Sequence, residues 1–289
     1  MIWVTWRQQR VQILAVFAVV AAVSVVLAVL RSQASSNSND LLLSYMVMLI
    51  AVLPALVGMF VGAPLFAREI ESGTHIFALS QSISRKKWLL TKGLMAGGSL
   101  AVAMFVLGVV AEWAMEPLQS STLARMETGA FEVQGVVVGG YAILAFAVGA
   151  TAGLVLRNTL AAMVVTLILY GAVLLTLGQS IRGNYAEPSY FEAPKNMVAG
   201  EADTARSWQV DFGYVDATGK QYSGLTMTEC RNVVDPKGCL DGLNLVASYV
   251  KVHLPSQFWR FQFTELGLVL ALSMVVLGGG AVMAKRRLT

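Results

Sequence analysis

The side chains that usually carry catalysis are scarce in this sequence. The only histidines are His75 and His253, and the only cysteines are Cys230 and Cys239. No glycine-rich phosphate loop ends in Lys-Ser or Lys-Thr, and neither H-E-x-x-H nor G-x-S-x-G occurs. Two cysteines without a nearby histidine pair do not favour a metal site. We therefore expect no catalytic residue, no metal and no bound cofactor in this chain, which is not expected to be an enzyme.

Polar side chains gather instead in one stretch, Ala67–Gly93. Two acids, Glu69 and Glu71, precede a Gly-Thr pair, and an apolar turn then leads to Ser84 and three consecutive bases. Such an acid-led segment between apolar runs predicts a short helix that docks into a groove on a cytosolic partner. We expect the two carboxylates near its start, where the helix dipole favours negative charge. The alternative for the bases is a simple membrane-surface anchor.

The composition excludes a soluble domain. Hydrophobic residues make up 56% of the 289 residues, charged residues make up 13%, and the mean hydropathy is +0.65. A soluble domain carries about 25% charged residues. The chain is therefore expected to be an integral, all-α polytopic membrane protein.

Uncharged segments long enough to cross a bilayer core of about 30 Å identify the spans. Arg157 alone separates two of them, so the chain must turn back in a tight hairpin at Arg157-Asn158. Six membrane-spanning helices are predicted, at Val11–Leu30, Leu41–Ala67, Gly93–Ala111, Val133–Leu156, Asn158–Ile181 and Leu266–Ala284.

The distribution of charge predicts the orientation. With both termini in the cytoplasm, the inner segments carry eleven basic and two acidic residues, a net +9. The outer segments carry the other ten basic and fifteen acidic residues, a net −5, and the total is the formal charge of +4. The positive-inside rule therefore predicts cytoplasmic N and C termini. The basic balance needs no nucleic-acid partner.

The fifth and sixth spans are joined by a segment long enough for a small extracellular domain, Arg182–Glu265. Trp208–Tyr214 alternates apolar and polar residues before turn residues, which predicts a β-hairpin. Leu243–Leu254 and Phe258–Phe263 are apolar and aromatic, and we expect short interfacial or re-entrant helices there. An oxidising compartment favours a disulfide between Cys230 and Cys239.

These observations divide the chain into four parts. The first is a short amphipathic elbow helix, which is either a simple interfacial anchor or a helix that meets a cytosolic partner. The elbow helix covers residues 1–10, and spans one to five cover residues 11–181, including a coupling loop at residues 68–92. The extracellular domain covers residues 182–265, and the sixth span with a basic tail covers residues 266–289.

Small residues in the spans recur at helix-packing spacing. They are either ordinary packing positions or part of a subunit interface or translocation path with kinked helices. The second span has a G-x-x-x-G between two prolines, and the fourth has glycines expected on one face. The residues singled out are Pro54, Gly58, Gly62, Gly135, Gly139, Phe146, Gly149 and Gly153.

The centre of each predicted span lacks ionisable residues. Ion-driven transporters and intramembrane enzymes usually need such groups within the membrane. If this protein moves a solute, we expect the driving energy to enter through another subunit.

The polar stretch resembles the loop between the second and third helices of type-2 ABC exporter permeases. There, an R-E-x-E-x-G-T segment precedes a Q-x-x-S-R element, and this chain has both, at Arg68–Thr74 and Gln81–Arg85. The order of six spans, with the long outer segment before the last, is similar too. The segments Trp6–Arg10 and Leu254–Gln262 look like an actinobacterial branch of that family.

The resemblance implies a function and partners. The chain would be the permease subunit of an exporter in the bacterial cytoplasmic membrane, with two permease chains, in a homodimer, and two ATP-binding chains that hold ATP and Mg²⁺. The cargo would be hydrophobic or amphipathic, such as a drug, antibiotic, lipid or peptide, which includes multidrug efflux. The residues implied in coupling to the ATP-binding subunit are Arg68, Glu69, Glu71, Gly73, Thr74, Ser84 and Arg85.

Two other functions are weighed against export. One is an immunity or sensor protein that binds a toxic peptide or antibiotic at its extracellular side without transporting it. The other is a membrane-embedded enzyme that acts on lipids, which the missing catalytic groups disfavour. Co-purification with an ATPase distinguishes export from both.

Overall fold

The structure is a computed structural model that describes most of the chain. Its description covers residues 2–33, 40–73, 84–118, 125–194, 207–224 and 244–287. Contacts divide the chain into two compact units, which we describe separately. Unit 1 contains residues 1–118, 131–180 and 262–289, and unit 2 contains residues 119–130 and 181–261.

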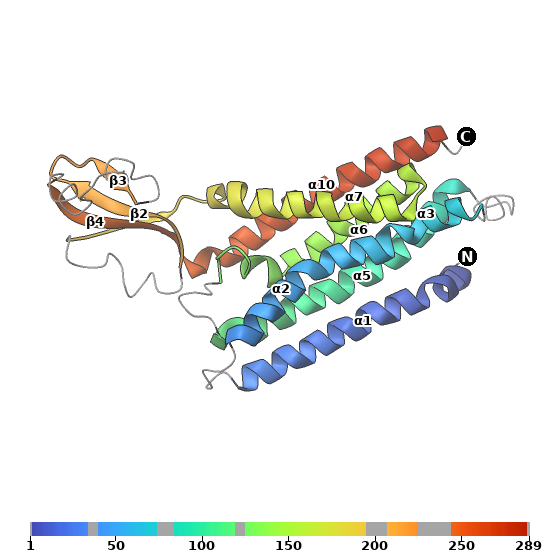
Figure 1. The fold of residues 1–289 in the computed structure, drawn as a ribbon, viewed down its shortest axis with the longest axis horizontal. Helices are drawn as coiled ribbons and strands as arrows, with labels where there is room; N and C mark the ends of the chain where they lie inside the picture. The colour runs from blue at the N-terminus through green and yellow to red at the C-terminus, as the bar shows by residue number, and fades with distance from the viewer. Residues whose placement is uncertain are drawn as a thin grey trace. The chain divides into compact units, whose positions relative to one another are not determined.

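Unit 1 contains the membrane-spanning helices (Figure 1). Six described helices are long and apolar enough to cross a membrane, which confirms the predicted number. Their limits are Trp3–Ser32, Leu41–Glu71, Lys87–Met115, Val137–Leu156, Thr159–Asn184 and Pro255–Met283.

The central helix of unit 1 is α6 (Val137–Leu156). It packs against α5 (Arg85–Met115), α7 (Thr159–Thr176) and the second span, and 89% of its apolar window is buried. The apolar windows of the other spans are half buried or less. Small residues let neighbouring backbones approach α6 closely, as the composition of this helix predicts.

The first span is one unbroken helix, α1 (Ile2–Ser32). It therefore differs from the separate elbow helix expected over residues 1–10. The physical reason lies in the sequence, because neither proline nor glycine occurs between Ile2 and Ser32 to end or bend the helix.

The second span consists of three helical pieces: α2 (Asp40–Val57), a π-helix (Gly58–Gly62) and α3 (Pro64–Glu71). A π-type hydrogen bond joins the Ala63 amide to the Gly58 carbonyl at 2.9 Å. Pro64 has no amide hydrogen, so one carbonyl of the preceding turn loses its helical donor. Gln12 of α1 donates to that carbonyl, on Phe60, at 3.5 Å.

The hairpin between α6 and α7 lies where it was predicted. Arg157 adopts a left-handed conformation with φ 53°, and its amide bonds to the Gly153 carbonyl to end α6. Asn158 then caps α7 by accepting a hydrogen bond from the Ala161 amide at 2.8 Å. Asparagine is among the best N-cap residues, so the sequence encodes this turn locally.

The sixth span begins earlier than the sequence predicted. Helix α10 covers Phe258–Arg287 and follows a short 3-10 turn, Pro255–Gln257. The prediction started the helix at Leu266, directly after Glu265, which is the last charged residue before the apolar run. That residue is buried within the helix rather than placed outside it.

Unit 2 contains a four-stranded antiparallel sheet with the order β1-β4-β2-β3. Its strands are β1 (Ser189–Pro194), β2 (Trp208–Asp216), β3 (Gln221–Ser223) and β4 (Leu245–His253). The predicted hairpin is present as β2 and β3. The Asp216 carboxylate closes its turn by accepting hydrogen bonds from the amides of Thr218 (2.8 Å) and Lys220 (3.0 Å).

The helix expected over Leu243–Leu254 was wrong, because residues 245–253 form the interior strand β4. Both faces of this strand carry buried residues, including Tyr249 and Val252. A strand buried on both faces reads as a continuous apolar run, which periodicity cannot distinguish from a buried helix. The valines at 246, 250 and 252 were the available strand signal.

Candidate functional site

The polar residues singled out in the sequence lie at the end of the second span. Arg68, Glu69 and Glu71 belong to the last turns of α3. The chain leaves this helix at Ser72 and Gly73, where glycine adopts φ 71° and its amide bonds to the Ile70 carbonyl. Glycine tolerates this left-handed conformation, which commonly ends helices.

The carboxylates therefore do not lie at a helix start, as the sequence analysis expected. They lie at the C-terminal end of α3, where the helix dipole disfavours negative charge. The apolar residues before them continue the second span into this region, so no separate acid-led helix forms among residues 64–73. Contacts with other helices compensate for the unfavourable position.

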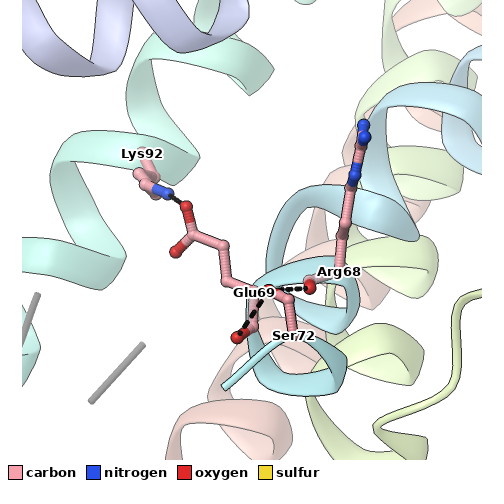
Figure 2. A network of polar contacts seen from close by, with 4 residues as sticks. All are labelled: Arg68, Glu69, Ser72 and Lys92. Atoms are coloured by element: carbon pink, nitrogen blue, oxygen red, sulfur yellow. Dashed lines mark hydrogen bonds and ion pairs between the residues drawn. The ribbon is translucent and has the colours of Figure 1, made fainter. Parts of the chain in front are cut away.

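Glu69 forms an ion pair with Lys92 of α5 (Figure 2). Lys92 is buried, and its ammonium lies 5.4 Å from the centroid of the Trp88 ring. The Trp88 ring in turn packs on Phe66 of α3, with centroids 5.2 Å apart. One ion pair and one aromatic contact thus join the ends of the second and third spans.

The Ser72 hydroxyl secures the end of α3 by donating to the carbonyl oxygen of Arg68 at 2.8 Å. Figure 2 shows the Arg68 side chain pointing away from the Glu69–Lys92 pair, and Arg68 is exposed. The Arg68 side chain is therefore accessible at the end of α3.

Glu71 connects α3 to the fifth span. One carboxylate oxygen accepts the Thr159 amide at 2.8 Å, and the other accepts the Thr159 hydroxyl at 2.7 Å. Thr159 is the first residue of α7, where free amides and the helix dipole favour an anion. Glu71 therefore serves as a second N-terminal cap for α7, beside Asn158.

The remaining predicted coupling residues begin the third span. Ser84 caps α5 by accepting a hydrogen bond from the Lys87 amide at 3.3 Å, and Arg85 is the first residue of that helix. Thr74 lies outside the described residues, as do Cys230 and Cys239. The structure thus brings Glu69 and Glu71 into contacts with α5 and α7.

The glycines singled out in the second and fourth spans mark close backbone approaches. A Cβ at Gly58 would lie 2.5 Å from the Ala145 carbonyl oxygen. A Cβ at Gly149 would lie 2.4 Å from the Gly58 carbonyl oxygen, and one at Gly153 would lie 2.3 Å from the Ala63 carbonyl oxygen. Side chains do not fit at these positions, so α6 and the π-helical region pack backbone to backbone.

The other small residues have different neighbours, which corrects the single face expected for them. Gly135 precedes α6, has φ 65° and faces Gln262, whereas Gly139 faces the Phe105 ring of α5. Phe146 lies over Gly97 of α5. The remaining residues of the set, Pro54 and Gly62, lie in α2 and in the π-helix, where a Cβ at Gly62 would be 2.9 Å from the Phe146 carbonyl oxygen.

The comparisons with known proteins decide the family. The family model for ABC-2 membrane transporter related proteins matches residues 29–182, which is more than half of the chain. This chain belongs to that family. The matched region contains α3, α5, α6 and α7, and therefore every helix of the site described above. No curated protein and no solved structure matches the chain.

Membership makes the chain a permease-type ABC-2 subunit and a multi-pass membrane protein. The family is typically a non-enzymatic membrane component and implies an ATP-binding partner. In this permease, the segment from Arg68 to Lys92 connects the second and third spans. At the start of this segment, Glu69 contacts α5 and Glu71 contacts α7.

The permease also contains a buried polar group that the sequence analysis missed. Gln262 of α10 accepts the Val137 amide at 3.0 Å, and its own amide group donates to the Phe131 carbonyl at 3.3 Å. The Tyr141 hydroxyl donates to the Glu265 carboxylate at 2.7 Å. These bonds join α10 to the start of α6. The available signal was the spacing of Gln262 and Glu265, which places both on one helix face.

Proposed function

We propose that this chain is the membrane-spanning subunit of an ATP-driven exporter. A separate ATP-binding subunit would hydrolyse ATP with Mg²⁺, and two copies of each subunit would form the working complex, with a homodimer of permeases. This chain would have no catalytic residue of its own. Family membership and the absence of a phosphate loop in the sequence support this division of labour.

We propose an orientation with both termini and the segment 68–92 in the cytoplasm, and with unit 2 outside. The positive-inside charge distribution supports it. The two termini also lie at the same end of unit 1 as α3 (Figure 1). In this orientation, Cys230 and Cys239 face an oxidising compartment, where we expect a disulfide between them.

The observation that carries the proposal is the double attachment of α3. Its last turn is joined to α5 through Glu69 and to α7 through Glu71. We propose that the segment after Gly73 meets the ATP-binding subunit, together with Arg68, Thr74, Ser84 and Arg85. A displacement applied there would reach the second, third and fifth spans together.

We propose a hydrophobic or amphipathic cargo, such as a drug, antibiotic, lipid or peptide. The support comes from the uncharged interior of the predicted spans, which offers few partners to a charged solute.

The test is reconstitution of the permease with candidate ATP-binding subunits from the same genome. We expect the two to co-purify and to move a labelled amphipathic compound in proteoliposomes only when ATP is hydrolysed. Two matched variants follow. Arg68→Gln should weaken the complex with the ATP-binding subunit, and Arg157→Gln, at the hairpin between α6 and α7, is the control that should leave the complex intact.

Three outcomes would contradict the proposal. The first is uphill transport on an ion gradient without the ATPase. The second is failure to bind any ATP-binding subunit. The third is tight binding of a toxic peptide at the outer side without ATP-dependent efflux, which would support an immunity or sensor role instead.

A further inference from the structure

Unit 1 contains an apolar groove between three membrane-spanning helices. Its volume is about 380 Å³, and its lining comes from α5, α6 and α10, with Phe66 from the first turn of α3 beside them. Gly93 and Gly98 of α5 leave the groove open, because a Cβ at either position would meet no atom within 4 Å. Neither the family match nor the contacts of Glu69 and Glu71 assigns a role to this groove.

The lining offers no charge to a ligand. Thr151 is its one polar side chain, and the hydroxyl of Thr151 already donates to the Val276 carbonyl at 3.4 Å. A group that needs hydrogen bonds would lose them on entering such a site. The chemistry of the groove therefore selects a hydrocarbon chain.

The dimensions of the groove fit a chain from one leaflet of the bilayer. Along α5 the lining runs from Leu89 to Ala101, which is roughly 18 Å at 1.5 Å per residue. Half of a bilayer core of about 30 Å is roughly 15 Å. Leu90 and Leu94 at the groove are 59% and 71% exposed, so the groove opens toward the lipid phase.

The lining residues of α5 and α10 are followed or preceded within a few residues by basic runs in the sequence. Helix α5 begins with Arg85-Lys86-Lys87, and the lining starts two residues later, at Leu89. Helix α10 ends with Lys285-Arg286-Arg287, four residues beyond the last lining residue, Ala281. Lys87 is exposed. Basic residues between spans at a cytoplasmic surface attract anionic lipid head groups.

We propose that the groove between α5, α6 and α10 binds an anionic phospholipid, with one acyl chain along Gly93–Ala101 and the phosphate at the basic helix ends near Lys87. The site shares Phe66 with the contacts between the second and third spans, and the proposal stands independently of the exported compound.

The test uses the full-length chain in nanodiscs with photoreactive phospholipids. A phosphatidylglycerol probe and a phosphatidylcholine probe carry the same diazirine-labelled acyl chain, and labelled peptides are identified by mass spectrometry. We expect the phosphatidylglycerol probe to label residues 89–101 and 277–281 in preference to α7. Lys87→Gln should lower that labelling by about fivefold and leave the phosphatidylcholine signal unchanged.

Filling the groove gives the matched control. A Cβ at Gly93 or Gly98 meets no atom within 4 Å, so Gly93→Leu and Gly98→Leu should fill the groove without a backbone clash and abolish the labelling. Gly171 of α7 is equally open, and Gly171→Leu should leave the labelling intact. Retained size-exclusion profiles show that each variant folds.

The proposal is overturned by equal labelling with the two probes, which would mean that the groove takes a chain without selecting the head group. It is also overturned by labelling of α7 as strong as that of the groove, which would indicate ordinary boundary lipid. Unchanged labelling in both groove-filled variants would exclude the site itself. Each result leaves the ATP-dependent export assay unaffected, so the two proposals fail separately.

Discussion

The Glu69–Lys92 ion pair provides the most direct test of the coupling end, because its two side chains are unequally buried. The side chain of Lys92 is 9% exposed and that of Glu69 is 22% exposed. Glu69→Gln leaves a buried ammonium without its carboxylate, whereas Lys92→Met leaves a carboxylate that water partly reaches. We therefore expect the substitution at Glu69 to cost more stability.

The magnitude follows from the surroundings of the two groups. Removing one partner of a buried pair costs about 3–5 kcal/mol. The Trp88 ring, 5.4 Å from the ammonium of Lys92, still contacts that charge after Glu69 is replaced, and this lowers the cost of leaving the ammonium unpaired by about 0.5–1 kcal/mol. Allowing also for partial exposure, we expect a loss of about 2–3 kcal/mol for Glu69→Gln and about 1 kcal/mol for Lys92→Met.

The assay is thermal unfolding of the purified chain in one detergent, with both single variants and the double variant. A change of 1 kcal/mol shifts Tm by about 2–4 °C in chains near this size. The double variant should unfold close to Lys92→Met, because it leaves no buried charge. Arg10→Gln, an exposed change on α1, should leave Tm unchanged.

Equal shifts for the two single variants would show that burial does not set the cost. Additive shifts in the double variant would show that the two groups do not interact. Either result would refute the reasoning from the ion pair and would remove one of the two attachments of α3.

Further predictions concern the other contacts. Glu71→Gln and Thr159→Val should each reduce ATP-dependent efflux while the complex with the ATPase persists, and loss of the complex on co-purification would contradict this. Gly153→Leu places side-chain atoms against a backbone carbonyl and should abolish monodisperse expression, whereas Gly171→Leu should not. Hydrogen bonds to the Asp216 carboxylate, first from Thr218, hold its pKa below the usual 3.8. That carboxylate stabilises the β2–β3 hairpin above this pH, and the stabilisation is lost as pH falls below it. The protection of β2 amides from hydrogen exchange, measured relative to the intrinsic exchange rate at each pH, should therefore fall on acidification, and Asp216→Asn should remove this dependence.

The number of spans and the hairpin at Arg157 were predictable from the sequence, because each depends on local composition. Twenty or more apolar residues identify a span irrespective of its neighbours. Asn158 is a strong N-cap, and a single arginine cannot be placed at the centre of a 49-residue helix at low cost. The β2–β3 hairpin was predictable for the same reason, from alternation and turn residues.

The contacts of Glu69 and Glu71 were not predictable, because they depend on how three helices pack. Charge and spacing indicated a polar segment but not that α3 would extend through it. The start of α10 was missed because Phe258–Phe263 was expected to form a separate short helix and Glu265 to lie outside the sixth span, whereas both belong to one helix. Their burial follows from partners more than 120 residues away in the chain, at Phe131, Val137 and Tyr141.

The two attachments of α3 restrict how a force could act on this permease. Glu69 and Glu71 hold the last turn of α3 to two different helices, so α3 cannot rotate about its axis without breaking one contact. A push near Gly73 would therefore move the ends of three spans as one body. The π-helix at Gly58–Gly62 lies between this body and the other half of the second span, and a π-helix can change its hydrogen bonding more easily than a regular α-helix. Under the proposed function, the second span should bend there, against the backbone of α6 at Gly149.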